Sequence, residues 1–290
     1  MPARTHKSSR IKFILLVLAA AWVIWPLFIM VSEGFRLDYG PLFTGRGVSY
    51  VRRFLQPQGG LRPTPVVYLR ELAQQAYPRV LLNSTVIGAV SIGLTLLVAL
   101  PAAYALARFR FRGKGLLTLS VLMLRTVSPF AVLVPIYLFY TQTPLFDNHI
   151  GMALVYLIIN IPIVTFMMRG FFADIPKAIY EAAITSGASE LTVLRRVALP
   201  LVIPGLIATV IFAFIATWNE FLFAQFLTGI TSKTVSRAVW SGFGEAVSSF
   251  KILDFDELNA GSSLALAPTL VLIFLIRKYL AAGVSLGTAR

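Results

Sequence analysis

The 290-residue sequence has no cysteine and only two histidines, and just 13% of its residues are charged. The absence of cysteine excludes disulfides, thiolate metal sites and cysteine nucleophiles. Ordinary soluble domains carry about 25% charged residues, so this composition, with a mean hydropathy of +0.79, indicates a polytopic membrane protein. The sequence also lacks a Gly-x-x-x-x-Gly-Lys-Ser/Thr phosphate loop, and therefore has no visible means to bind ATP.

Acidic residues are scarce: 12 stand against 26 basic residues, a net charge of +14. In a soluble protein this excess would suggest nucleic acid as a partner. Here the basic residues cluster at the ends of apolar runs, the pattern produced by positive-inside topology and contact with anionic lipid. We therefore predict membrane lipid as a partner and no nucleic acid.

Long apolar runs predict six transmembrane helices, since crossing a bilayer core takes about 20 apolar residues. The predicted spans cover residues 13–31, 80–107, 116–140, 150–168, 201–227 and 264–280. The first run is too long for the apolar region of a secretory signal peptide, so we expect it to be retained as a span. The predicted fold class is all-α, with one transmembrane domain over residues 1–290.

The charges of the connecting segments predict the topology. Four basic residues crowd the short loop after the second span, which marks that loop as cytoplasmic, whereas residues 141–149 contain no Lys or Arg. The resulting arrangement places both termini and residues 174–200 in the cytoplasm, with 15 basic residues inside and 10 outside. Seven of those ten lie in the long extracytoplasmic loop 33–79, mostly far from the span ends, where charge has less influence.

Residues 174–200, which we call the hook, connect the fourth and fifth spans and combine helix-forming residues with mixed charge. Pro176 fits the first turn of a helix, and Asp174 is expected to accept bonds from its free amides or to face its positive end. Helical spacing predicts one small apolar face made of Ile175, Ile179, Ala182 and Ala183. A water-facing helical element between two membrane spans is suited to docking another protein.

The second half of the hook predicts a turn and a second helix. Gly187 can adopt the left-handed conformation that redirects the chain, and Ser189 can cap the helix that follows. Leu191, Leu194 and Val197 form a second apolar stripe. A stop is expected at Leu199-Pro200.

The spacing of Glu181-Ala182-Ala183, Gly187 and Leu199-Pro200 resembles the "EAA" motif of the membrane subunits of ATP-binding-cassette importers. Ser186 stands where that family often has Asp, and Val197 where it often has Ile. The resemblance implies a coupling helix that seats in a cleft of a separate ATPase subunit. It assigns the coupling role to Glu181, Ala182, Ala183, Gly187, Leu199 and Pro200.

Further stretches are similar to the second membrane subunit of carbohydrate importers of the maltose-uptake type: Asn83-Ser84, residues 102–108, Arg169-Gly170-Phe171-Phe172 with Ile175-Pro176, and Trp218-Asn219-Glu220-Phe221. This resemblance implies a multi-pass permease of a prokaryotic cytoplasmic membrane that moves a di- or oligosaccharide by alternating access. Its implied partners are a second related permease subunit, two ATPase subunits that bind ATP and Mg, and an extracytoplasmic solute-binding protein. The chain itself would then be no enzyme and hold no cofactor or metal. The end of the chain, residues 282–290, departs from the family's usual Gly-Ala-Val-Lys-Gly-like tail.

Three alternatives stay open, and one is a non-transporting membrane scaffold or receptor, which would not co-purify with a nucleotide-binding subunit. Another solute, such as a glycerol phosphate, is compatible with the same importer branch. A secondary carrier would use midplane carboxylates, and the one acidic residue placed inside a predicted span is Glu220, near its outer end.

Polar residues inside the predicted spans are candidates for a translocation path: Arg125, Asn160, Thr217, Asn219 and Glu220. Arg125 lies about ten residues into the third span, roughly 15 Å along a helix and near mid-depth, where an arginine needs a polar path or a partner. Pro129 is expected to kink the helix after it. The alternative is that these side chains form interhelical hydrogen bonds that fix the bundle.

Overall fold

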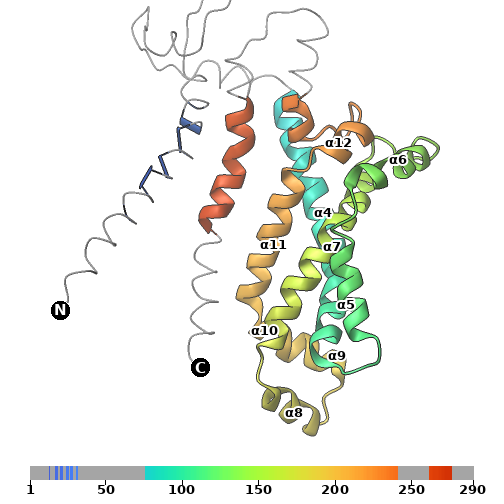
Figure 1. The fold of residues 1–290 in the computed structure, drawn as a ribbon, viewed down its shortest axis with the longest axis vertical. Helices are drawn as coiled ribbons and strands as arrows, with labels where there is room; N and C mark the ends of the chain where they lie inside the picture. The colour runs from blue at the N-terminus through green and yellow to red at the C-terminus, as the bar shows by residue number, and fades with distance from the viewer. Residues whose placement is uncertain are drawn as a thin grey trace, which may run out of the picture. The chain divides into compact units, whose positions relative to one another are not determined.

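The computed structural model describes residues 76–240 and 261–275, together with scattered positions between 13 and 31. All secondary structure in this part of the chain is helical (Figure 1), in agreement with the predicted all-α class. The chain divides into two compact units, residues 1–77 with 239–266 and residues 78–238 with 267–290. The single domain over residues 1–290 stays a prediction.

The first unit has few described residues. Helical positions occur between residues 13 and 31, where the rings of Trp25 and Phe28 stack with centroids 6.3 Å apart. The Tyr77 hydroxyl donates a hydrogen bond to the Gly261 carbonyl at 3.1 Å. Most of the predicted first span, the loop 33–79, and the end of the predicted sixth span lie outside the described residues.

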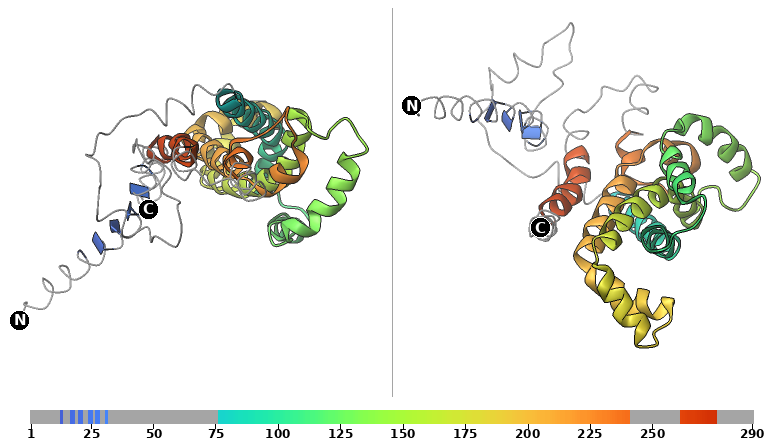
Figure 2. Two further views of the ribbon diagram at one scale, coloured as in Figure 1. Left: turned by 90° about the horizontal axis from the view of Figure 1, so that it is seen from above. Right: turned by 60° about the horizontal axis from the view of Figure 1, so that its bottom comes forward.

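The second unit is a helical bundle whose elements run in chain order: α4 (Ala76–Arg108), α5 (Lys114–Met123), α6 (Pro129–Tyr140), α7 (His149–Ala173), α8 (Lys177–Thr185), α9 (Glu190–Val193), the π-helical turn η1 (Leu194–Ala198), α10 (Leu199–Leu201), α11 (Ile203–Trp218) and α12 (Leu222–Leu227). Helices α4, α7 and α11 run side by side (Figures 1 and 2). A further helix covers Gly261–Leu275.

Two of the described helices are long and apolar enough to cross a membrane, over Tyr77–Arg108 and His149–Ala173. They correspond to the predicted second and fourth spans. A third is gained if Glu190–Leu201 and Ile203–Trp218, which meet at a bend of 81°, count as one span.

The single helix expected over residues 116–140 is instead two helices, α5 and α6, with a break at residues 124–128. The cause is Pro129, which disfavours a helical conformation at the preceding residue and has no N–H to donate. Ser128 accordingly has an extended ψ of 126°, and Pro129 begins α6. The expected kink is therefore a complete interruption.

The helix expected over residues 201–227 is also interrupted, between α11 and α12. The Glu220 carboxylate accepts hydrogen bonds from the backbone N–H groups of Phe223 at 2.8 Å and Ala224 at 3.2 Å. These bonds satisfy free amides in the first turn of α12 and so favour a new helix start at this point.

Two apolar cores hold the second unit together. The hook-end core joins α4, α7, α11 and the hook through buried side chains: Ile92, Ala99, Ala103, Tyr104, Val164, Met168, Phe172, Ile175, Tyr180, Val193, Leu194, Ala198, Val202 and Ala213. The far-end core joins α4, α6, α7 and α12 through Ile87, Leu133, Tyr140, Met152, Val155, Tyr156, Phe223, Ala224 and Leu227. The hook is thus packed as part of the bundle.

Candidate functional site

The hook projects from one end of the helical bundle, where α8 forms its tip (Figures 1 and 2). At Gly187 the backbone takes the predicted left-handed conformation, with φ of +83°. The Gly187 N–H donates to the Ile184 carbonyl at 2.9 Å, and the Ala188 N–H donates to the Ala183 carbonyl at 3.1 Å. This pair of bonds is a Schellman motif, which satisfies the last carbonyls of α8 and reverses the chain.

The second helix of the hook starts at its predicted cap. The Ser189 hydroxyl accepts a hydrogen bond from the Thr192 N–H at 3.3 Å. The first helix differs from expectation, since Pro176 takes the N-cap position and no side chain caps α8. Asp174 is instead the C-cap residue of α7.

The expected stop at Leu199-Pro200 lies slightly later, at Val202, where φ is −98° and ψ is 10°. Pro200 is accommodated in the first turn of α10, directly after the π-helical turn. Pro204 occupies the first turn of α11, where its missing N–H costs nothing. The chain bends by 81° between these two helices.

The buried faces of the hook also differ from the expected ones. Tyr180 and Ala183, one turn apart, pack inward, while Ile179 and Ala182 are exposed. The reason is that α8 begins only after Pro176, so Ile175 belongs to a different segment and the helical phase shifts. In the second helix Val193 and Leu194 are buried and Leu191 is 55% exposed.

Five residues, which we call the hook anchor, fasten this element to the long helices: Tyr104, Arg108, Phe172, Tyr180 and Glu190. The Tyr104 ring meets the Phe172 ring edge-on at 5.7 Å and lies 6.0 Å from the Tyr180 ring. The Tyr104 hydroxyl donates to a Glu190 carboxylate oxygen at 2.8 Å. Such aromatic contacts add to the gain from apolar burial.

The Arg108 guanidinium completes the anchor by lying 4.5 Å above the Tyr180 ring, a cation–π contact. Burial raises the pKa of the Tyr180 phenol, and the charge of Arg108 opposes that rise only in part. The phenol therefore stays neutral at physiological pH and donates to the Phe172 carbonyl at 3.3 Å. Apart from the aromatic residues themselves, no sequence pattern predicted this anchor.

The predicted coupling residues divide into two groups. Glu181, Ala182, Gly187 and Pro200 are exposed. Ala183 and Leu199 are partly buried against the hook-end core. Three large apolar side chains extend the exposed surface, because Ile179, Ile184 and Leu191 are 37%, 41% and 55% exposed. The hook therefore presents an apolar outer face on a firmly packed inner one.

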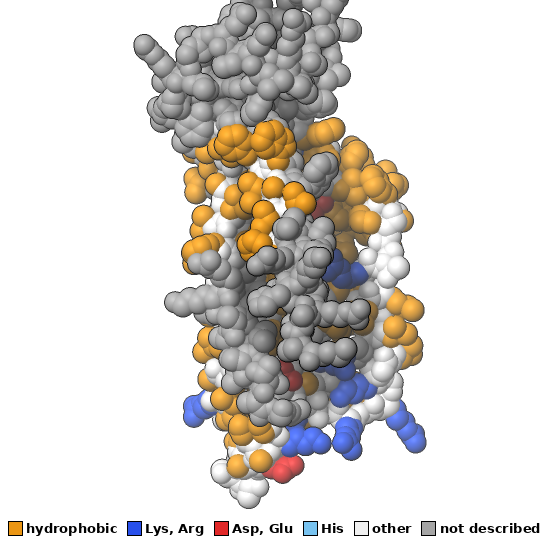
Figure 3. Space-filling view, turned by 60° about the vertical axis from the view of Figure 1, so that its left-hand side comes forward, with side chains coloured by type: hydrophobic (Ala, Val, Ile, Leu, Met, Phe, Trp, Pro, Cys, Tyr) orange, Lys and Arg blue, Asp and Glu red, His pale blue; other side chains and the backbone are white. Residues whose placement is uncertain are grey.

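Basic side chains gather at the same end of the molecule (Figure 3). Arg195 and Arg196 are exposed on the hook, and Arg110 and Arg112 are exposed in the loop after α4. The positive charge complements an acidic protein surface or anionic lipid headgroups.

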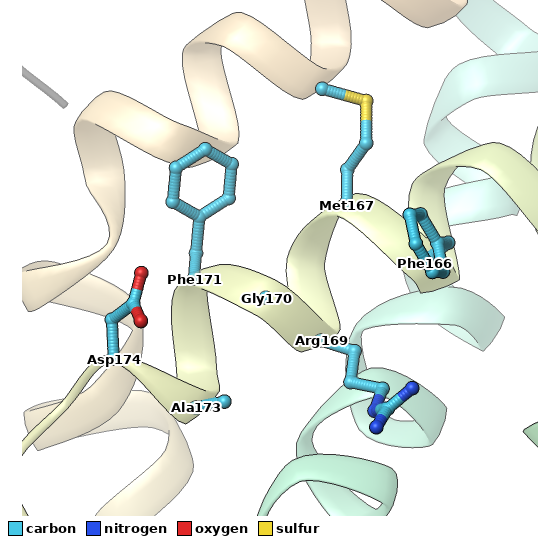
Figure 4. Close-up of a pocket in the computed structure, with 7 residues that line it drawn as sticks. All are labelled: Phe166, Met167, Arg169, Gly170, Phe171, Ala173 and Asp174. Atoms are coloured by element: carbon cyan, nitrogen blue, oxygen red, sulfur yellow. The ribbon is translucent and has the colours of Figure 1, made fainter. Parts of the chain in front are cut away.

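An open, mainly apolar groove of about 430 Å³ runs along the hook end of α7, lined by Phe166, Met167, Arg169, Gly170, Phe171, Ala173 and Asp174. Figure 4 shows Phe171 and Arg169 pointing to opposite sides of it. The Phe171 ring lies so close to Gly205 that a Cβ added there would be 2.4 Å from the ring. Within the described residues, no group of three or more Asp, Glu, His or Cys could hold a metal ion.

The structure brings together two of the candidate path residues. Asn160 on α7 is fully buried, and its amide nitrogen donates to Thr217 on α11 at 2.9 Å and to Ser91 on α4 at 3.2 Å. This geometry is that of an interhelical bridge among the three bundle helices. It favours the alternative interpretation for Asn160 and Thr217.

The other three candidate path residues lie elsewhere. Arg125 is exposed in the break between α5 and α6. Asn219 is exposed at the end of α11, where its amide donates to the Ile215 carbonyl at 2.8 Å. Glu220 caps α12.

At the far end, Asp147 forms an arrangement that the sequence did not reveal. Its carboxylate accepts hydrogen bonds from the backbone N–H groups of Gly229, Thr231 and Ser232 at 2.6, 3.0 and 2.9 Å, and from the Ser232 hydroxyl at 2.8 Å. Burial raises the pKa of Asp147, but these four bonds outweigh it and hold the pKa below its ordinary value. We call this arrangement the carboxylate clamp.

The fold and the hook together define a helical membrane protein with an exposed apolar surface at one end of its bundle. The chain belongs to the family of binding-protein-dependent transport system inner membrane components, whose family model matches residues 95–285. Permeases of ATP-binding-cassette transporters are thus its relatives.

Two relatives and one solved structure illustrate the similarity. A probable ABC transporter permease of Sinorhizobium fredii is 32% identical over 92% of this chain and 90% of its own length. A diacetylchitobiose uptake system permease of Streptomyces coelicolor is 30% identical over 72% of this chain and 68% of its own length. A chain of a bacterial ABC transporter that imports the acidic polysaccharide alginate shares the fold, with a TM-score of 0.74, 20% identity and coverage of 96% of this chain and 99% of that one.

Proposed function

We propose that this chain is the membrane-spanning subunit of an ATP-driven importer, and that its hook couples the membrane helices to a separate ATPase. The observation that carries the proposal is the exposed apolar face of the hook, with Ile179, Ala182 and Leu191 in the solvent. Exposed apolar surface on a firmly packed element is typical of a protein interaction site. The anchor joins this face to both α4 and α7.

In this proposal the chain crosses a prokaryotic cytoplasmic membrane six times, with both termini and the hook in the cytoplasm. The excess of basic residues around the hook and the absence of Lys and Arg in residues 141–149 support this orientation. The bends at residues 124–128 and 219–221 then belong to the third and fifth spans.

The partners proposed are a second related permease subunit, two ATPase subunits that bind ATP and Mg, and an extracytoplasmic solute-binding protein. ATP binding closes the ATPase pair and moves the hook, and the hook moves α4 and α7 so that the path opens to the other side. Glu181, Ala182, Gly187 and Pro200 are positioned to contact the ATPase. Ala183 and Leu199 are positioned to pass the motion to the bundle. ATP hydrolysis, which resets the cycle, resides in the partner.

The solute proposed is a sugar. The diacetylchitobiose permease and the alginate importer that resemble this chain handle saccharides, as their names state. Arg125, Asn219 and Glu220 are proposed to border the path, with Asn160 and Thr217 as the interhelical bridge behind it. A glycerol phosphate is the alternative solute. A secondary carrier is disfavoured because Glu220, the carboxylate in the predicted fifth span, is engaged by two backbone amides of α12.

The experiment that tests the proposal is ATP hydrolysis in lipid vesicles by the complete complex of both permease subunits and the ATPase. It is measured with the binding protein empty and loaded from a panel of sugars and glycerol 3-phosphate. Stimulation by a loaded binding protein is expected. An ATPase that does not co-purify with this chain would refute the coupling role of the hook.

A further inference from the structure

The break between α5 and α6, residues 124–128, is the most unusual feature of the described membrane segments. It interrupts an apolar stretch in which the side chains of Leu122, Met123, Leu124, Val127 and Phe130 are all exposed. Arg125 lies inside it and is exposed too. Within residues 76–240 and 261–275, no hydrogen bond or ion pair engages its guanidinium.

The depth of the break makes its exposure informative. The ten-residue α5, which begins at Lys114, has a length of about 15 Å, half the thickness of a bilayer core. An arginine at mid-depth is costly in lipid, and irregular backbone is tolerated there only against protein or a water-filled cavity. The break is therefore expected to face away from lipid.

The electrostatics of the break favour an anion. Helix α6 starts there with Pro129, and the positive end of its dipole adds to the charge of Arg125. Among the described residues, no ion pair joins Arg125 to a carboxylate. Asp147 is engaged by three backbone amides of residues 229–232, and Glu220 by two of α12.

We propose that Arg125 lines the solute path and selects a saccharide that carries an anionic group, such as a carboxylate, sulfonate or phosphate. The planar guanidinium can bind such a group through two parallel N–H donors. This inference rests on the proposed importer function and deepens it by naming the charge class of the cargo.

The first test uses the fact that the chain has no cysteine. Ser128→Cys places a single thiol in the break, and Leu119→Cys places a matched thiol on the exposed surface of α5. In the complete complex, water-soluble methanethiosulfonates should modify Ser128→Cys and leave Leu119→Cys unmodified. The sulfonate-bearing reagent should react faster than the ammonium-bearing one, and adding Arg125→Gln should lower that ratio about threefold.

Failure to modify Ser128→Cys would overturn the inference, since the break would then not face water. An unchanged ratio in Arg125→Gln would overturn it as well, because the arginine would not set the local potential. Both results leave the importer function standing as long as loaded binding protein stimulates ATP hydrolysis.

The second test concerns the cargo. Among trehalose, diacetylchitobiose, glucuronyl-glucose and glycerol 3-phosphate, we expect the anionic saccharide, glucuronyl-glucose, to give the largest binding-protein-dependent ATP hydrolysis. Its uptake should fall about tenfold in Arg125→Gln, a loss of about 1.4 kcal/mol, and recover only in part in Arg125→Lys, which restores the charge but not the two parallel donors. Stimulation by a neutral sugar, with unchanged uptake in Arg125→Gln, would refute the charge class.

Discussion

Each end of the bundle has an apolar core, but the two ends differ in the contacts that fasten their connecting segments. At the hook end, the rings of Tyr104, Phe172 and Tyr180 pack around a few polar contacts. At the far end, four hydrogen bonds converge on the carboxylate of Asp147. Ring packing is weakly directional and tolerates small rotations, whereas hydrogen bonds weaken steeply when misaligned.

We therefore expect motion at the hook end and rigidity at the far end. The coupling proposed for the hook requires it to keep its ring contacts with α4 and α7 as it moves. The loop at residues 228–232 is fixed in one geometry. Arg237 strengthens it by donating to the Thr228 hydroxyl at 2.8 Å and to the Gly229 carbonyl at 3.1 Å.

The largest effect on ATP-driven uptake is expected at the outer face of the hook. Ala182→Trp places a large ring on the exposed side of α8, so ATP-driven uptake should fall at least about tenfold while thermal stability stays near wild type. The matched control, Ala183→Trp, overfills the hook-end core and should cost about 1–3 kcal/mol of folding stability. Uptake and melting temperature of the two variants are the measurements. If Ala182→Trp kept wild-type uptake, the outer face of α8 would not be part of the docking surface.

The largest loss of folding stability is expected when the hook anchor is disrupted. Tyr180→Ala deletes a ring that is 3% exposed and touches both Tyr104 and Arg108, which should cost about 3–5 kcal/mol. Tyr104→Phe removes only the hydroxyl that donates to Glu190, and about 1–3 kcal/mol is expected for that charged bond. Thermal unfolding in detergent, together with proteolysis of the hook, measures both. Equal losses in the two variants would mean that the hydroxyl, and not the rings, holds the hook.

A smaller effect is expected at the carboxylate clamp. Asp147→Asn replaces the charged acceptor of three backbone hydrogen bonds by a neutral amide. The change should lower folding stability by about 1–3 kcal/mol at neutral pH. Because the pKa of Asp147 is lower in the folded state, its stabilisation is complete above the unfolded pKa of about 4 and is lost as pH falls further. The difference in melting temperature between wild type and variant should therefore shrink below about pH 4. A difference that persists unchanged at lower pH would contradict an ionised clamp.

The smallest effect is expected at the turn of the hook. Gly187→Ala meets no neighbouring atom within 4 Å, so its cost is the left-handed backbone alone, about 1–2 kcal/mol. Gly187→Asn should lose less, because asparagine tolerates this conformation. Unfolding curves of the two variants give the comparison. A stable Gly187→Ala would show that the turn does not need its present geometry.

Local sequence patterns predicted the turn and the second helix of the hook well, and they predicted the long spans only in part. Gly187 and Ser189 act as predicted, since a left-handed turn and a helix cap depend on a few neighbouring residues. The prolines were less informative. Pro129 was expected to kink one continuous helix, but the helix is interrupted before it and Pro129 begins α6. Pro200 was expected to stop a helix that continues to Leu201. How a proline is accommodated depends on what the adjoining turns can pack against.

Residue type and spacing alone predicted the all-α class, the apolar spans over Tyr77–Arg108 and His149–Ala173, and the hook that follows the second of these spans. These features follow from composition and periodicity, which can be read from short stretches of the sequence. Only the tertiary structure decided that Ala182 faces out and Ala183 faces in, that Asn160 bridges three helices, and that Asp147 clamps residues more than 80 positions away. Those outcomes depend on contacts between segments distant in sequence, and no local pattern encodes which segments will meet.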